Sequence, residues 1–367
     1  MSIEIKKCAV LGAGVMGAQI AGHIANAGIP SLLFDINEEL AQKGVDGLSK
    51  LKPAPLFSSS NASLVTPCTY DNDMEKLNDC DLIIEAVAEK IEIKHAVYKN
   101  LLPHLKQGAI LASNTSGIPL ANLVEVLPDD FQKSFLIAHF FNPPRYLKLL
   151  ELVKGEKTSD EVYETMTEFG ETTLGKGIVH AKDTPGFIGN RLINAGGPLT
   201  YHKAVEMGLT IEDVDALYGT LVGNAKSAYF RTQDVVGLDT ALNVQNNMFD
   251  RVTTESDEER QKFKAPDMLV KLVEDGRLGQ KSGSGWYKKE GKEILSLDLD
   301  TMEYTPTKKR MFDTIRVGKP IKDLKKRLAA ITYLDDIGAK FLWECNAPMF
   351  TYCLLYTSDA ADEVDRV

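Results

Sequence analysis

The glycine-rich sequence GAGVMG at residues 12–17 constrains the fold more than any other part of the chain. It follows a short apolar run at residues 7–12 and precedes a segment with apolar residues at helical spacing that ends at Gly28. A second apolar run comes next and closes with Asp35. A strand, a glycine-rich turn, a helix and a strand in this order predict a βαβ unit whose turn binds the pyrophosphate of a dinucleotide.

Each part of this unit has a chemical role. The first glycine allows the tight turn, the second lets the backbone approach a pyrophosphate, and the third lets the helix pack closely on the strand. Asp35 is placed to accept ribose hydroxyls, and because no Arg follows it, NAD is favoured over NADP. The alternatives are a purely structural turn and a helix-capping role for the acid. The residues expected to line the dinucleotide are Gly12, Gly14, Val15, Met16, Gly17 and Asp35.

The alternation of strands and helices continues beyond this unit. Further apolar runs predict strands at residues 82–89, 108–114, 134–141, 148–153 and 176–183. We therefore expect a doubly wound, mostly parallel Rossmann sheet over residues 1–183, which binds ligands at the carboxyl ends of its strands. From Thr184-Pro185 to about Lys271 the spacing is helical, which predicts an all-α domain over residues 184–289.

Composition excludes several classes of function. The chain has 42 Lys and Arg against 52 Asp and Glu, and this net charge of −10 disfavours nucleic acid and anionic membranes as partners. Its five cysteines form no CxxC pair, so neither a disulfide framework nor a metal site is expected. No apolar run is long enough to insert into a membrane, and no secretory signal is evident, so we expect a cytoplasmic protein.

Four polar positions near predicted strand ends indicate alcohol oxidation. A histidine such as His139 can take the proton of an alcohol while hydride leaves its carbon, and a carboxylate such as Glu151 can orient that histidine. Ser116 and Asn190 can bond the oxygen on which charge changes. Taken singly, these residues are more often a core histidine, a solvated acid, a helix cap and an exposed helical residue, so the prediction rests on their joint placement.

Seven motifs follow one another in a characteristic order over about 290 residues: GAGVMG (12–17), EAVAEKIEIK (85–94), SNTSG (113–117), HFFNP (139–143), KDTPGFIGNR (182–191), DVVGLDT (234–240) and GQKSGSGWYKK (279–289). In these motifs and their order the chain resembles the L-3-hydroxyacyl-CoA dehydrogenases of fatty-acid β-oxidation. It is most similar to the long bacterial multifunctional forms in LKPAPL (51–56), NAKSAYFRTQDVVGLDT (224–240) and GWYKKEGKEILSLD (285–298).

This resemblance implies oxidation of an L-3-hydroxyacyl-CoA to the 3-ketoacyl-CoA, with NAD as the hydride acceptor. By matching position, His139 is the general base, Glu151 orients it, and Ser116 and Asn190 contact the 3-oxygen of the substrate. Two alternatives remain: a dehydrogenase of a free hydroxy acid, and a non-catalytic structural protein of the same fold. The family is commonly dimeric, so a homodimer is possible. The resemblance adds Glu89, Lys94, Asn142 and Lys281 to the NAD site.

One segment departs from the family pattern. Family members usually carry a long helical hairpin that helps to hold the adenosine end of CoA, whereas residues 37–64 are short here and include two prolines. The segment offers Lys43, Lys50 and Lys52 as cations, of which Lys50 and Lys52 are the candidates for CoA phosphates.

The C-terminal part suggests a fragment. We expect a linker over residues 290–321 and the start of a second, truncated helical domain over residues 322–352, and the resemblance implies that the natural chain continues into further domains, among them an enoyl-CoA hydratase. Residues 353–367 resemble one reading frame of a transposase sequencing adapter, with a natural acidic tail as the alternative. This tail should pack against nothing. The truncated domain should leave an apolar face under-buried at Leu328, Ile331, Leu334, Ile337, Phe341 and Leu342.

Overall fold

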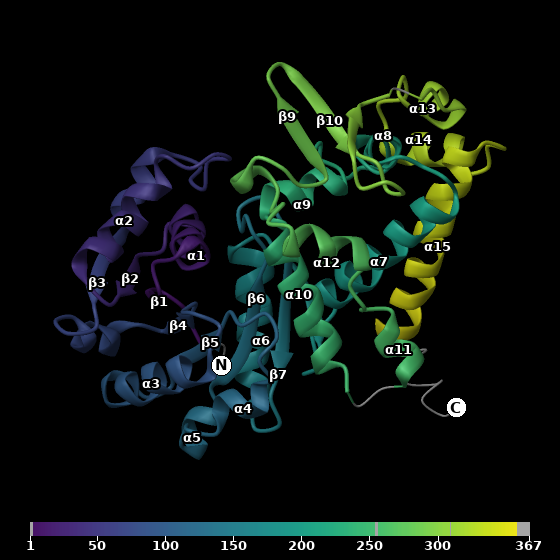
Figure 1. The fold of residues 1–367 in the computed structure, drawn as a ribbon. Coiled ribbons are helices and arrows are strands. Elements are labelled where there is room, and N and C mark those ends of the chain that lie inside the picture. Colours follow the sequence, from purple (N-terminus) through teal and green to yellow (C-terminus); the bar gives the residue numbers. More distant parts are fainter. Residues whose placement is uncertain (1–2, 254–255, 309, 358–367) are drawn as a thin grey trace. The chain divides into compact units, whose positions relative to one another are not determined.

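The computed structural model describes residues 3–253, 256–308 and 310–357. The chain forms two compact units, Met1–Ile188 and Gly189–Val367 (Figure 1). Each unit has a hydrophobic core of its own.

The first unit is built on an eight-stranded sheet with the order β3-β2-β1-β4-β5-β6-β7-β8. All neighbouring strands pair in parallel except β6 and β7, which are antiparallel. The doubly wound, mostly parallel sheet predicted from the sequence is therefore confirmed. The strands are β1 (Cys8–Leu11), β2 (Ser31–Asp35), β3 (Val65–Thr69), β4 (Leu82–Glu85), β5 (Ile110–Ser113), β6 (Phe135–Phe140), β7 (Leu149–Lys154) and β8 (Gly177–Ala181).

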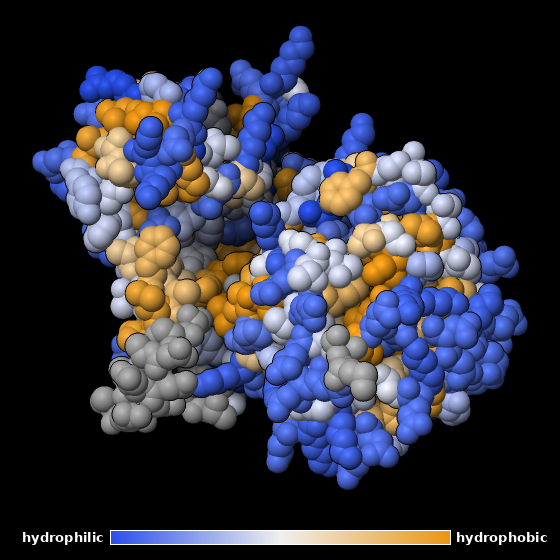
Figure 2. Space-filling view, turned by 180° about the vertical axis from the view of Figure 1, so that it is seen from behind, coloured by the Kyte–Doolittle hydropathy of each residue, from blue (hydrophilic) through white to orange (hydrophobic). Residues whose placement is uncertain are grey.

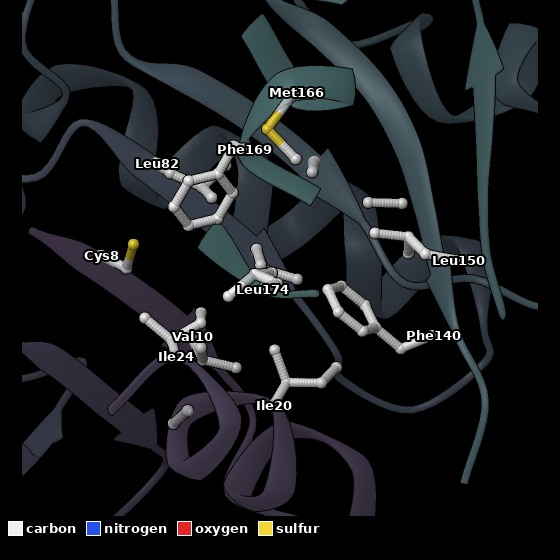
Figure 3. Close-up of a cluster of buried hydrophobic side chains, with 14 of the residues drawn as sticks. Cys8, Val10, Ile20, Ile24, Leu82, Phe140, Leu150, Met166, Phe169 and Leu174 are labelled. Carbon is white, nitrogen blue, oxygen red and sulfur yellow. The ribbon is translucent and has the colours of Figure 1, made fainter. Parts of the chain in front are cut away.

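Helices cover both faces of this sheet, because alternate residues of each strand point to opposite sides. Cys8 and Val10 pack with α1 and α6 in one apolar cluster (Figure 3), whereas Ala9 and Leu11 pack with α3 and α4 in another. The helices are α1 (Val15–Asn26), α2 (Glu38–Leu48), α3 (Ile91–Leu101), α4 (Leu120–Val124), α5 (Asp129–Gln132) and α6 (Asp160–Glu168). Shorter helical turns are Ser59–Leu64, Met74–Asp79, Leu102–His104 and Phe169–Thr173.

The second unit is mainly helical. Its core contains Phe230, Trp286 and Phe341, and α15 lies along α7 (Figure 1). The helices are α7 (Gly189–Glu206), α8 (Ile211–Leu217), α9 (Phe230–Val236), α10 (Leu238–Arg251), α11 (Asp257–Gln261), α12 (Asp267–Glu274), α13 (Asp313–Gly318), α14 (Leu324–Ile331) and α15 (Ile337–Thr357), with short turns at Thr220–Val222 and Gln280–Ser282. A small antiparallel sheet consists of β9 (Tyr287–Glu290), β10 (Glu293–Leu297) and β11 (Tyr304–Pro306).

Three boundaries differ from the sequence predictions. The first long helix of the second unit begins at Gly189 and not at Pro185, so the two units divide after Ile188. The expected linker, residues 290–321, instead forms β10, β11 and α13, because Leu295 and Leu297 are buried in the core of this unit. The edge strand β3 was not predicted from the sequence, since it is short and contains Pro67, which only an edge strand tolerates.

The expected under-buried face of residues 322–352 is also absent in the described chain. Ile331, Phe341 and Leu342 are 2%, 0% and 7% exposed, because they complete the core of the second unit. The other three residues of that face are partly buried against the same core.

The expectation that the C-terminal tail packs against nothing is wrong for its first residues. Residues 353–357 continue α15, and the ring of Tyr356 lies 4.1 Å from the guanidinium of Arg191. Residues 358–367 lie outside the described residues.

Apolar side chains remain exposed among hydrophilic ones on the face shown in Figure 2. Among the exposed apolar residues of α15, Trp343 and Phe350 are 53% and 67% exposed. Among the described helices, none combines the length and the apolar character that crossing a bilayer requires.

Candidate active site

In the glycine turn between β1 and α1, the first and third glycines leave no room for a side chain. Gly12 has a φ of +102°, and a Cβ on it would lie 2.7 Å from the carbonyl oxygen of Ala86, the residue that follows β4. A Cβ on Gly17 would lie 1.8 Å from the carbonyl oxygen of Gly12. In contrast, a Cβ on Gly14, the N-cap of α1, would meet no described atom within 4 Å beyond its own neighbouring backbone, and this N-cap has no side-chain hydrogen bond.

This turn fits the pyrophosphate of a dinucleotide. The backbone N–H groups at the start of α1 are not bonded by a capping side chain, and the space beside Gly14 is open to an anion. Val15, in the first turn of the helix, is 64% exposed, and Met16 is partly exposed. The tight turn at Gly12 and the close packing at Gly17 are as the sequence predicted, whereas the cofactor contacts of Val15 and Met16 stay predictions.

Asp35 ends β2 beside the glycine turn. One of its carboxylate oxygens accepts a hydrogen bond of 2.7 Å from the backbone N–H of Ala13, and the other accepts one of 2.7 Å from that of Ile36. The N-cap of α2 is Asn37, whose side chain accepts from Leu40 N–H. The helix-capping alternative for Asp35 is therefore wrong, and its carboxylate is held where the second strand meets the dinucleotide turn.

His139 and Glu151 form a buried pair. They lie directly opposite each other on the antiparallel strands β6 and β7, and Nδ1 of His139 is 2.7 Å from Oε2 of Glu151. The side chains are 7% and 0% exposed, and the rings of Phe141 and Phe187 flank the imidazole. The other oxygen of Glu151 accepts a hydrogen bond of 3.0 Å from the backbone N–H of Ile188. The carboxylate therefore holds the imidazole ring on its Nδ1 side.

Glu89 connects the segments around Ser116 and Lys94. Its carboxylate accepts hydrogen bonds from Thr115 Oγ1 at 2.6 Å, from Ser116 N at 2.9 Å and from Ser116 Oγ at 3.3 Å, and Lys94 Nζ lies 3.2 Å away. Burial raises the pKa of Glu89, but the charge of Lys94 and these hydrogen bonds outweigh burial and hold the pKa below its ordinary value. Glu89 is therefore a fixed anion next to Ser116.

Lys94 is a buried cation and not a solvated surface charge. It is 1% exposed, and its ammonium donates to both carboxylate oxygens of Glu85 at 2.7 and 2.9 Å. Glu85 is 0% exposed and also accepts from Tyr98 and Ser113. Sequence reasoning missed this cluster, although an acid at the end of an otherwise apolar strand is a signal that a buried partner exists.

Asn142 lies in the loop after β6 and reaches the dinucleotide-binding helix. Its Oδ1 accepts a hydrogen bond of 3.2 Å from Gln19 Nε2, which also donates to the carbonyl oxygen of Val15. The same loop is held by Lys176, whose ammonium donates to the carbonyl oxygens of Pro144 and Leu147. Asn142 thus lies beside α1, the helix that follows the glycine turn, and its contact with NAD stays a prediction.

The short segment 37–64 consists of α2, an irregular stretch and the helical turn Ser59–Leu64. Lys43, Lys50 and Lys52 are exposed. The segment is fastened by Arg145, which donates to the carbonyl oxygens of Ala54 and Leu56 at 2.7 Å each. Sequence reasoning did not single out this arginine.

Two predicted site residues, Asn190 and Lys281, belong to the second unit. Asn190 lies in the first turn of α7, where its carbonyl oxygen accepts a hydrogen bond of 2.7 Å from Asn194 Nδ2. Lys281 lies in the turn before β9, and its ammonium pairs with Asp239 at the start of α10.

Comparison with known proteins agrees with this geometry. Residues 7–184 match the family model of the NAD binding domain of 3-hydroxyacyl-CoA dehydrogenase, and residues 186–289 match the model of its C-terminal domain. The crystal structure of FadB2 from M. tuberculosis superposes with a TM-score of 0.65 at 32% sequence identity, over 78% of this chain and 99% of that one.

Curated relatives show the same pattern. A probable 3-hydroxyacyl-CoA dehydrogenase of Deinococcus radiodurans is 43% identical over 294 residues, which cover 78% of this chain and 84% of the relative. A probable 3-hydroxyacyl-CoA dehydrogenase of Bacillus subtilis is 39% identical over 388 residues, which cover the whole chain but 49% of the relative, so the chain spans about half of that protein's length. From its NAD-binding unit to the end of its C-terminal match, the chain belongs to the 3-hydroxyacyl-CoA dehydrogenase family.

Proposed function

We propose that the protein oxidises an L-3-hydroxyacyl-CoA to the 3-ketoacyl-CoA with NAD, as a step of fatty-acid β-oxidation. The observation that carries this proposal is the buried pair of His139 and Glu151, whose Nδ1 and Oε2 atoms are 2.7 Å apart on paired strands of the NAD-binding unit. An imidazole fixed by a carboxylate is a suitable base for an alcohol.

In the proposed reaction, Nε2 of His139 takes the proton of the 3-hydroxyl while the bond between C3 and its hydrogen breaks. NAD, when bound, would supply the acceptor for the hydride that leaves C3. Glu151, which is 0% exposed, offsets the positive charge that develops on the imidazole, and its bond to Nδ1 prevents the ring from turning. Phe141 and Phe187 keep water from the ring faces.

We propose that the hydroxyl of Ser116 and the side chain of Asn190 bond the 3-oxygen as it becomes a carbonyl. Ser116 is exposed and its backbone is fixed by Glu89, so its hydroxyl is held near the end of β5. The exposed Lys50 and Lys52 are the proposed partners of the CoA phosphates.

The cofactor is proposed to lie on the glycine turn, with its pyrophosphate at the N-terminus of α1. Asp35 would accept hydrogen bonds from the ribose hydroxyls. Glu89, whose carboxylate accepts a hydrogen bond from the backbone N–H of Ser116, would line the cofactor site next to that residue. Asn142 and Lys281 complete the proposed set, and Lys94 acts in it by holding Glu89.

The test compares substrates and measures cofactor binding separately. Reduced nicotinamide absorbance is followed with L-3-hydroxybutyryl-CoA and with free L-3-hydroxybutyrate, and the affinity for NAD and NADP is measured by calorimetry. We expect tighter binding of NAD than of NADP, and kcat/KM at least about a hundredfold higher for the CoA ester, because the free acid lacks all contacts with the CoA moiety. Equal or better turnover of the free acid would support the hydroxy-acid alternative, and NAD binding without turnover of either compound would support the non-catalytic one.

A further inference from the structure

Lys176 is a buried cation of the first unit. It lies directly before β8 and is 7% exposed. Within the residues that the structure describes, no carboxylate pairs with its ammonium. Lysines are rarely buried without such a partner, because taking the charge out of water costs free energy that an ion pair would offset. The cost of burying this charge points to a role for it.

Backbone carbonyl oxygens take the place of a carboxylate partner. The Lys176 ammonium donates to the carbonyl oxygen of Leu147 at 3.0 Å and also to that of Pro144. Both belong to the loop 141–148, which joins β6 to β7. Hydrogen bonds from a charged donor are about twice as strong as those from a neutral one, so the charge of Lys176 fastens this loop.

The loop 141–148 and the segment 174–176 that carries Lys176 both contact α1, the helix that follows the glycine turn. On the loop, Asn142 Oδ1 accepts a hydrogen bond of 3.2 Å from Gln19 of α1. In the segment before β8, the carbonyl oxygen of Leu174 lies 3.1 Å from Nε2 of His23, near the end of α1. Lys176 therefore joins two segments that pack on the same helix.

We propose that Lys176 is a positioning residue for NAD, because its charge holds the loop 141–148 against α1 and the cofactor binds tightly only when the loop is held there. The inference rests on the proposed placement of NAD at the glycine turn, and not on the identity of the base or of the substrate. If the loop leaves α1 for part of the time, a smaller fraction of the protein is competent to bind NAD. The apparent dissociation constant then rises in proportion.

A change of pH can remove this charge. Burial lowers the pKa of Lys176 to about 8, in surroundings where Phe140 and Leu174 belong to the apolar cluster of Figure 3. The charged or titratable groups that act on the same region are His23 of α1 and Arg145 of the loop. Burial, and then the charge of Lys176, lowers the pKa of His23 to about 4, so this imidazole is neutral at pH 7, whereas Arg145 keeps its charge. Between pH 7 and pH 9, Lys176 is therefore the member of this group of three that loses its charge.

The first test measures the NAD dissociation constant by calorimetry at pH 7 and pH 9 and compares the ratio of the two values. We expect this constant to be about fivefold larger at pH 9 in the wild type, because about nine-tenths of Lys176 is then neutral and its two hydrogen bonds to the loop are weaker. Lys176→Arg keeps the charge at both pH values and should show a ratio close to one. Lys176→Met should bind NAD about tenfold more weakly than the wild type at pH 7, with no further change at pH 9.

The second test examines the loop without the cofactor. Trypsin cleaves after arginine, and the side chain of Arg145 is bonded to backbone carbonyl oxygens, so cleavage there requires the loop to open. Mass spectrometry follows this cleavage at pH 7. We expect it to be at least about tenfold faster in Lys176→Met than in the wild type. Lys157→Met, at an exposed position of the same unit, is the matched control and should be cleaved after Arg145 at the wild-type rate.

Each outcome decides the proposal. Equal NAD affinity at pH 7 and pH 9 in the wild type, or the same loss of affinity in Lys176→Arg, would overturn it, and so would a wild-type rate of cleavage after Arg145 in Lys176→Met. If Lys176→Met does not fold, Lys176→Gln, which keeps an uncharged donor, replaces it with the same direction of change. A wild-type protein that binds no NAD at either pH would refute the proposed cofactor site, and the positioning role with it.

Discussion

The buried ion pair of Lys94 and Glu85 makes a sharp prediction about the stability of the first unit. Both side chains are at most 1% exposed, and the Lys94 ammonium lies within 2.7 to 3.2 Å of oxygens of Glu85 and Glu89. Lys94→Met removes the cation and leaves the Glu85 carboxylate buried. Tyr98 and Ser113 still donate to that carboxylate, so we expect a cost at the lower end for a broken buried pair, about 3 kcal/mol.

Hydrogen exchange followed by mass spectrometry measures this cost locally, with peptides that cover β4 and α3. A loss of about 3 kcal/mol corresponds to exchange that is about a hundredfold faster. Lys99→Met, at an exposed position of α3, is the matched control and should leave the rates unchanged. Adding Glu85→Gln to Lys94→Met should recover at least about 1 kcal/mol relative to the sum of the single variants, because the unpaired charge is gone. Wild-type rates in Lys94→Met, or strictly additive effects, would refute the reasoning.

Three further predictions concern the glycine turn and the core beside it. Asp35→Ala combined with Ile36→Arg should shift the preference from NAD towards NADP, as measured by the ratio of the two dissociation constants; an unchanged ratio would contradict the assigned role of the carboxylate. Gly17→Ala should abolish NAD binding, because its Cβ would lie 1.8 Å from a carbonyl oxygen. Gly14→Ala should keep the fold, as measured by circular dichroism, because the Cβ position of Gly14 is open. Equal unfolding of the two variants would argue against this geometry. Burial, and then the charge of Lys176, lowers the pKa of His23 to about 4, so the native state binds fewer protons than the unfolded one and stability falls by about 3 kcal/mol as the pH drops from 6.5 to 4. Urea titrations at pH 6.5 and pH 4 should show that this loss of stability disappears in His23→Gln. If the variant loses as much stability as the wild type, His23 is not the source of the loss.

The parts of the fold and site that could be predicted are those with local signals. The glycine turn, Asp35 and the helix between them form one continuous segment, and the structure has them as expected. His139 and Glu151 were predicted to lie near strand ends, and the antiparallel pairing of β6 with β7 places them opposite each other.

What could not be predicted depends on contacts between distant segments. The acid at the end of β4 signals a buried partner, but the local pattern does not say that the hydroxyl groups completing the cluster come from α3 and β5. The burial of Phe341 depends likewise on the core of the whole second unit. The segment expected to be a linker instead forms part of a sheet, because a hairpin turn at Gly291, with a φ of +60°, lets β9 and β10 pair.

The same limit applies to Arg145, which reaches back across about ninety residues to the carbonyl oxygens of the short segment after α2. A single arginine in a loop carries no sequence signal of such a contact. For its partner segment, residues 37–64, the sequence showed only that the long helical hairpin of the family is shortened.

The measurement that tests the central claim most directly is the single-turnover rate of hydride transfer in His139→Gln, with L-3-hydroxybutyryl-CoA and saturating NAD. The matched control is His180→Gln, an exposed histidine on β8 of the same sheet. The account predicts a rate lower by about 10²–10⁴-fold in His139→Gln, with an NAD dissociation constant within about twofold of wild type, and a normal rate in His180→Gln. A His139→Gln protein that transfers hydride at the wild-type rate would contradict the account.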